Sequence, residues 1–93
     1  MKNRNAHQDK RQPLREAVAM HSNILAMIRN YEAFNLLDES LTAKQKLQYK
    51  LELREIKMSS ILLRMKASKK LQEYHMAYAD SQKLWYLMSP SER

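Results

Sequence analysis

The sequence predicts an all-α protein with two or three helices, arranged as a small bundle or as an extended helical hairpin. Two counts lead to this prediction. None of the 93 residues is glycine, which normally supplies the positive φ angles of tight turns in β-hairpins. Only six residues are β-branched, too few to build a sheet. The same lack of glycine excludes glycine-rich phosphate-binding loops, EF-hands and nucleophile elbows.

The chain opens with a polar stretch that differs from the rest. Residues 1–12 are almost all polar or charged. This predicts a flexible basic arm, because little apolar surface is available there to offset the entropy of ordering. Pro13 suits the first position of a helix, where its missing N–H is not needed. From Leu14 onwards apolar residues recur three and four apart, which predicts a first helix over about 13–35.

This first helix carries more apolar surface than one neighbouring helix covers. Beside its main apolar face lie Met20, Met27 and Phe34, which are seven residues apart. At about 100° per residue, the combined apolar arc spans roughly 200°. We therefore expect part of the arc to face a second neighbour or a partner.

Capping signals separate the first helix from the second. Asn35 can adopt the left-handed conformation that ends a helix. Thr42 and Gln45 match a capping box, with Ser40 as a competing cap. These signals predict a second helix over about 42–67.

A third helix is predicted over about 69–88, and Ser68 is its candidate cap. The polar residues 66–70 do not force a break, so one continuous helix over both segments is the alternative. Pro90 then prevents further helix. Residues 13–89 thus form a single helical domain in this prediction, followed by the polar tail 90–93.

The second helix has apolar residues on two sides. Residues 46–58 alternate between apolar and polar, as a strand would, but their types are those of strong helix formers. Drawn as a helix, the alternation becomes two apolar strips. One strip holds Leu47, Leu51, Met58, Leu62 and Met65, and the other holds Tyr49, Leu53, Ile56 and Leu63. Such a helix can contact two neighbours at once.

Positive charge gathers along one flank of this second helix. The chain has a net charge of +7, and five cations share the flank between the two apolar strips. We name them the basic stripe: Lys46, Lys50, Arg54, Lys57 and Arg64. Together with Lys10 and Arg11 of the arm, they could follow nucleic-acid phosphates. The plainer interpretation is a solvated face of a bundle.

Catalytic and metal-binding chemistry is not expected. The chain has no cysteine, which excludes thiol catalysis and cysteine-based metal sites. The histidines do not form a metal-binding pair, and the carboxylates do not cluster. His21 lies within the apolar arc and is interpreted as a hydrogen-bonded core or interface residue. We expect no enzyme activity, no cofactor and no metal.

Aromatic residues of the third helix also have two interpretations. Tyr74, Tyr78 and Trp85 share one face. The simpler prediction packs them in the core against the first two helices, and the alternative places them in a partner groove. The longest apolar runs are short, so no membrane partner is expected and a cytoplasmic location is predicted.

The leading hypothesis is a non-enzymatic helical protein–protein interaction module that acts as an adaptor, inhibitor or regulator. Its predicted partner is another protein or its own copy, as a homodimer. The surplus apolar residues predicted to bind this partner are Met20, Met27, Phe34, Tyr49, Leu53, Ile56 and Leu63. The alternative is a small basic nucleic-acid-binding protein that uses the basic stripe, Lys10 and Arg11.

Overall fold

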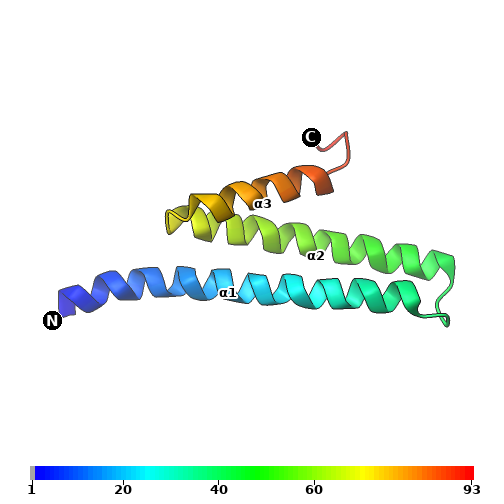
Figure 1. Cartoon of the computed structure of the whole chain (residues 1–93), viewed down its shortest axis with the longest axis horizontal. Helices are drawn as coiled ribbons and strands as arrows, with labels where there is room; N and C mark the ends of the chain where they lie inside the picture. Colours follow the sequence, from blue (N-terminus) through cyan, green and yellow to red (C-terminus); the bar gives the residue numbers. More distant parts are fainter. Residues whose placement is uncertain (1) are drawn as a thin grey trace.

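The computed structural model describes the backbone of residues 2–93 and the side chains of residues 10–93. Within these residues it contains three helices and no strand: α1 (Lys2–Leu37), α2 (Ala43–Lys70) and α3 (Tyr74–Leu87). The all-α prediction is therefore confirmed. The helices form an extended hairpin of α1 and α2, with α3 folded back along α2 (Figure 1).

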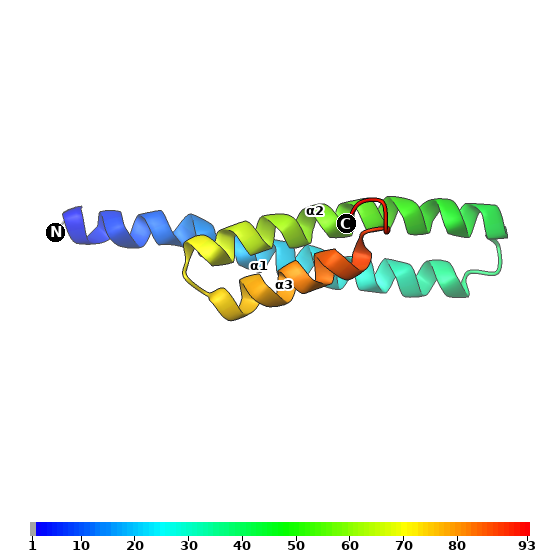
Figure 2. The ribbon, with the colours of Figure 1, turned by 90° about the horizontal axis from the view of Figure 1, so that it is seen from above.

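The molecule is long and open. Its Cα atoms extend over 59 × 29 × 16 Å, with a radius of gyration of 16.8 Å, whereas a compact domain of this length has about 12 Å. Helix α2 lies between the other two helices in Figure 1 and packs on both. Seen from above, α3 lies along α2 and turns out of the plane of the hairpin (Figure 2). Within the described residues, α1 and α3 do not pack on each other.

The start of α1 differs from the prediction. The helix begins at Lys2, so Pro13 lies inside it, and the predicted start at Pro13 was wrong. Polar composition predicts exposure, but Lys, Arg, Gln and Ala are also good helix formers, so it does not exclude a helix. The flexibility predicted for residues 1–12 stays a prediction. At its other end α1 continues past Asn35 to Leu37.

The turn between α1 and α2 follows the predicted capping chemistry. The Thr42 hydroxyl accepts a hydrogen bond from the Gln45 backbone N–H at 3.1 Å, and the Gln45 side chain accepts one from the Thr42 backbone N–H at 2.9 Å. Both halves of the capping box are therefore present. Ser40 does not cap α2; its hydroxyl donates to the Asp38 carboxylate at 2.6 Å.

A sharp turn ends α2 and decides that α2 and α3 are separate helices. Gln72 has a φ of 63°, and the backbone N–H of Glu73 donates to the Ser68 carbonyl at 2.8 Å. Ser68 was wrongly predicted to cap the third helix. It lies buried inside α2, where its hydroxyl donates to the Met65 carbonyl at 3.0 Å.

The core is small for a chain of this length. Among residues 10–93, six apolar residues are buried: Ile28, Ile61, Ala67, Leu71, Ala77 and Leu84. The accessible surface area is 7592 Å², whereas a compact monomer of 11.1 kDa has about 5,650 Å². The chain thus exposes about 1,900 Å² more than its mass requires. Among residues 10–93, 16 large hydrophobic residues are exposed.

Candidate protein-interaction surface

One arginine holds the three helices in their relative positions. Arg64 of α2 donates to both carboxylate oxygens of Asp80 in α3, at 2.9 and 2.6 Å, and to the Ser22 hydroxyl of α1 at 3.0 Å. The Asp80 side chain is 1% exposed and that of Arg64 12%. Two parallel bonds between a guanidinium and a carboxylate fix distance and orientation together. The rotation of α3 on α2 is therefore set by this pair.

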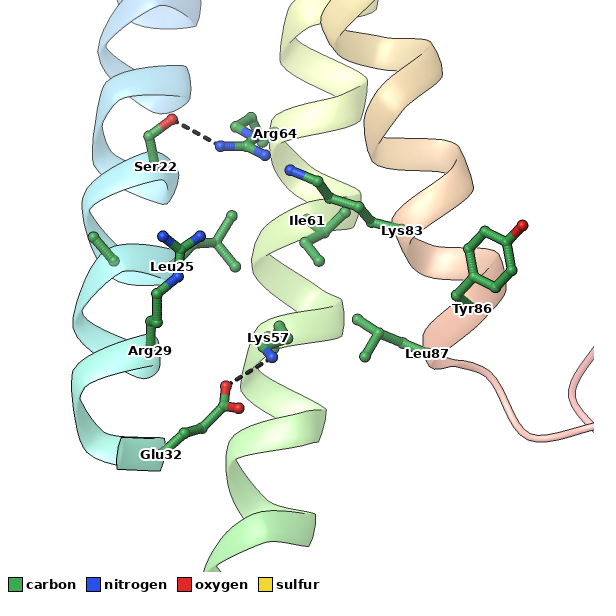
Figure 3. A pocket seen from close by; sticks show the side chains of 11 residues that line it. Ser22, Leu25, Arg29, Glu32, Lys57, Ile61, Arg64, Lys83, Tyr86 and Leu87 are labelled. Carbon is green, nitrogen blue, oxygen red and sulfur yellow. Dashed lines mark hydrogen bonds and ion pairs between the residues drawn. The ribbon is translucent and has the colours of Figure 1, made fainter. Parts of the chain in front are cut away.

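A groove of about 530 Å³ lies between α1 and α3, with α2 as its floor. Figure 3 shows Leu25 and Ile61 within it, and the bonds from Arg64 to Ser22 and from Lys57 to Glu32 across it. The Lys57–Glu32 pair is 2.7 Å long. This hydrogen bond and this ion pair join α1 to α2 on the groove side of the hairpin.

The opposite side of the hairpin exposes a broad apolar surface. We call it the hairpin face and define it by seven residues: Met20, Met27, Tyr31 and Phe34 of α1, and Tyr49, Ile56 and Leu63 of α2. All seven are between 40% and 72% exposed. Exposed patches of this kind mark interaction sites in soluble proteins.

Helix geometry places these residues away from the groove. Ile56 and Leu63 each precede a groove residue by one position, Lys57 or Arg64, and so lie about 100° around α2 from it. Met20 and Met27 precede the groove residues Ser22 and Arg29 by two positions, which places them about 160° around α1. For antiparallel helices, these rotations bring both sets to the same side of the hairpin.

Six of the seven residues predicted to bind a partner are exposed on the hairpin face, and their binding stays a prediction. The seventh, Leu53, is half-buried and lines a second pocket with Glu32, Lys46 and Lys50. Tyr31 was not among the predicted residues and is 54% exposed. Its signal was present: Met20, Ile24, Met27, Tyr31 and Phe34 alternate four and three apart. That spacing is a heptad seam of its own.

The aromatic residues of α3 do not lie in the core, contrary to the simpler prediction. Tyr74, Tyr78 and Trp85 are at least half exposed. Helix α3 instead turns Ala77, Asp80 and Leu84 toward α2, because the Arg64–Asp80 pair sets its rotation. Trp85 receives the Arg93 guanidinium over its ring, 5.3 Å from the centroid.

The basic stripe is largely engaged within the molecule. Lys46 donates to the Leu36 carbonyl at 3.1 Å, and Arg54 donates to the Leu87 carbonyl at 2.7 Å. Lys57 pairs with Glu32, and Arg64 contacts Asp80 and Ser22, as described above. Lys50 is exposed and pairs with no described residue. Of the arm cations, Lys10 is exposed, and Arg11 donates to the Leu71 carbonyl at 3.2 Å.

His21 is buried, as the sequence predicts, but the predicted hydrogen bond is not found at its Nδ1, which has no partner among the described residues. The described side chains contain no group of three His, Asp or Glu that could hold a metal ion. In the part of the chain that the structure covers, no helix has the length and apolar character needed to cross a membrane.

Comparisons with protein-family models, curated proteins and solved structures found no match for this chain.

Proposed function

We propose that the protein is a non-enzymatic helical interaction module, an adaptor, inhibitor or regulator, whose hairpin face binds another protein chain. The observation that carries the proposal is the exposure of two apolar seams, one from α1 and one from α2, on the same side of the hairpin. Aromatic and methionine side chains dominate this surface. Both are enriched in protein–protein interfaces, and methionine adapts to partners of different shape. The cytoplasm remains the proposed location.

Surface area supports the same proposal. A standard interface removes about 800 Å² from each partner, and the chain exposes about 1,900 Å² beyond a compact monomer of its mass. Covering the hairpin face would therefore bring the chain toward the exposure of an ordinary folded protein.

Nucleic-acid binding through the basic stripe is the weaker alternative. Four of its five cations, all except Lys50, already bind carbonyl, hydroxyl or carboxylate oxygens within the molecule. Releasing Arg64 for a phosphate would leave the buried Asp80 carboxylate without its partner, which is costly. Arg29 and Lys83 are two further cations that line the groove, beside the engaged Lys57 and Arg64.

Affinity capture from an extract of the source cells, with and without nuclease, tests the proposal. The test variant is Met27→Lys/Ile56→Lys, which places two charges in the hairpin face. The matched control is Asn30→Lys/Gln48→Lys, which adds the same charges to the same two helices at exposed positions outside the hairpin face.

We expect protein partners, the chain's own copy included, to remain bound to the wild type and the control after nuclease treatment. The test variant should lose them. Loss of all bound material on nuclease treatment would favour the nucleic-acid alternative. Equal capture by all three proteins would show that the hairpin face is not the binding surface.

A further inference from the structure

We propose that the hairpin face binds a second copy of this chain in an antiparallel four-helix bundle. In this bundle α1 packs on α1 of the second copy, α2 packs on α2, and the twofold axis runs across the helices at the level of Met27 and Ile56. The inference rests on the proposed function and deepens it by naming the partner and its orientation.

The hairpin face is built in matched layers. Contacts across the hairpin join Leu36 to Lys46, Ser22 to Arg64 and Glu32 to Lys57, and the two residue numbers add to 82, 86 and 89. When two helices are antiparallel, the numbers of two residues at the same level add to a constant. Contacts made by long side chains depart from this constant by a few residues, because such side chains reach along the helix. The exposed pairs Met20 with Leu63, Met27 with Ile56, and Phe34 with Tyr49 all add to 83.

These three pairs therefore form three layers across the hairpin face. Neighbouring layers lie seven residues apart on both helices, which is about 10.5 Å. Tyr49, Ile56 and Leu63 of α2 recur seven residues apart, as Met20, Met27 and Phe34 of α1 do. This is the spacing by which helices of a bundle interdigitate. A partner that repeats it on two antiparallel helices fits the whole face, and this chain is such a partner.

Side-chain size favours one of the two face-to-face arrangements. With the axis along the helices, the aromatic layer Phe34–Tyr49 would meet its own copy, and Met20–Leu63 would also meet itself. One layer would be overfilled and another underfilled. With the axis across the helices, each aromatic layer meets the smaller Met20–Leu63 layer of the second copy. Even packing density in every layer is the condition for a stable core.

Charge favours the same arrangement. At the open end of the hairpin, residues 10–16 and 66–73 hold six Lys or Arg and two Glu. At the loop end, residues 32–52 hold four acidic residues against three Lys. An axis across the helices brings the basic end of one copy to the acidic end of the other. An axis along the helices would bring like ends together, where repulsion disfavours association.

The area to be covered also suits a second copy. About 1,900 Å² of excess surface per chain exceeds the roughly 800 Å² that a standard interface removes from each partner. For two chains the excess is about 3,800 Å², which is within the roughly 2,000–5,000 Å² that obligate homodimers bury in total. A pair of hairpins 59 Å long offers a contact of this size.

Sedimentation equilibrium of the full chain gives the first test. We expect a mass of twice the 11.1 kDa of one chain for the wild type and for Asn30→Lys/Gln48→Lys. Met27→Lys/Ile56→Lys should raise the dimer dissociation constant by roughly 100-fold or more, because it buries ammonium groups against apolar side chains. Circular dichroism shows whether each variant keeps its helices.

Cysteine cross-linking gives the second test and reads the orientation directly. The chain has no natural cysteine, so Met27→Cys should be cross-linked to its own copy by a short bis-maleimide. A mixture of Phe34→Cys and Met20→Cys chains should cross-link to each other. If Phe34→Cys links instead to Tyr49→Cys, the axis runs along the helices and the proposed bundle is wrong. Asn30→Cys, on the outer side of α1, should stay uncross-linked.

Failure of this inference is distinguishable from failure of the proposed function. A wild-type chain that is monomeric at micromolar concentration overturns the dimer. If that monomer still captures a different protein through the hairpin face, the interaction module stands with another partner. If it captures nothing and forms no dimer, both are overturned.

Discussion

Arg64 of α2 and Asp80 of α3 are joined by two parallel hydrogen bonds of 2.9 and 2.6 Å. The same guanidinium reaches Ser22 of α1 at 3.0 Å, so one side chain contacts all three helices. The apolar core is small, so we expect this polar junction to contribute much of what fixes the three helices relative to one another. It also turns the aromatic residues of α3 outward.

Removing one partner of this junction should be strongly destabilising. Asp80→Asn keeps the shape of the side chain but leaves a nearly buried guanidinium without its counter-charge. We expect a loss of about 3–5 kcal/mol in the free energy of unfolding. Urea denaturation at one fixed protein concentration measures it, since any association also contributes to apparent stability.

Two comparisons sharpen that prediction. Arg64→Met/Asp80→Leu removes both charges and should recover most of the lost stability, because the desolvation cost disappears with the pair. Glu52→Gln removes a carboxylate that is exposed on α2 and should change the free energy of unfolding by less than about 0.5 kcal/mol. If Asp80→Asn proves as mild as Glu52→Gln, the junction does not hold the helices together.

His21 should be replaceable by an apolar residue with a gain in stability. Its side chain is buried, and its Nδ1 has no hydrogen-bond partner in the described structure. Relieving one unsatisfied buried polar atom is worth about 1–3 kcal/mol, so His21→Leu should raise the urea midpoint. His75→Leu, at an exposed position, serves as the control and should leave it nearly unchanged. A lower midpoint for His21→Leu would show that the imidazole makes a contact that the structure does not contain.

Gln72 should be replaceable by glycine with a gain of about 1 kcal/mol. Its φ of 63° lies in the left-handed region, which costs an L-residue roughly 1–2 kcal/mol through contact of Cβ with the backbone. Glycine avoids that contact, although it raises the entropy of the unfolded chain. Thermal unfolding measures this. Gln72→Gly should raise the melting temperature, and Gln48→Gly, a substitution within helix α2, should lower it.

Glu92 ties the C-terminal tail to α2 in a pH-dependent way. The backbone N–H of Ser89 and the guanidinium of Arg54 donate to Glu92 Oε1 at 2.9 and 2.6 Å, and they lower its pKa from 4.5 to about 2. Because the folded-state pKa is depressed, this docking contributes stability above pH 4.5. The contribution is lost as the pH falls from 4.5 toward 2.

Carboxyl titration by NMR measures the Glu92 pKa. Arg54→Gln should raise it toward the ordinary value without reaching it, since the Ser89 N–H remains the larger cause. Lys50→Gln removes a charge from the same helix without touching Glu92 and should leave the pKa unchanged. A wild-type pKa near 4.5 would mean that the tail is not docked.

The exposure of the residues on the hairpin face could be predicted from the sequence, whereas their binding role stays a prediction. A helix of known period converts the spacing of Met20, Met27 and Phe34 into an angle, and that angle exceeded what one neighbour covers. The alternation in residues 46–58 gave the second seam in the same way. Tyr31 was missed because residues at the border of two seams belong equally to both until the neighbour's position is known.

The basic stripe could not be interpreted in this way. Spacing shows that Lys46, Arg54, Lys57 and Arg64 share a flank, but not which oxygens lie opposite them. Asp80 is 16 residues from Arg64 in the chain, and only the folding back of α3 brings the two together. Whether a cation is exposed or buried in an ion pair depends on such long-range geometry.

Residue types and local spacing alone determined that the chain is helical, where α2 begins, and that two helices carry more apolar surface than one hairpin buries. These are short-range properties, set by backbone propensity, capping and the 3.6-residue period. Tertiary structure alone decided that the chain turns at Gln72, that Arg64 holds Asp80, and that both surplus seams lie on one face. Each of these depends on how distant segments pack against each other, which residue types and local spacing do not specify.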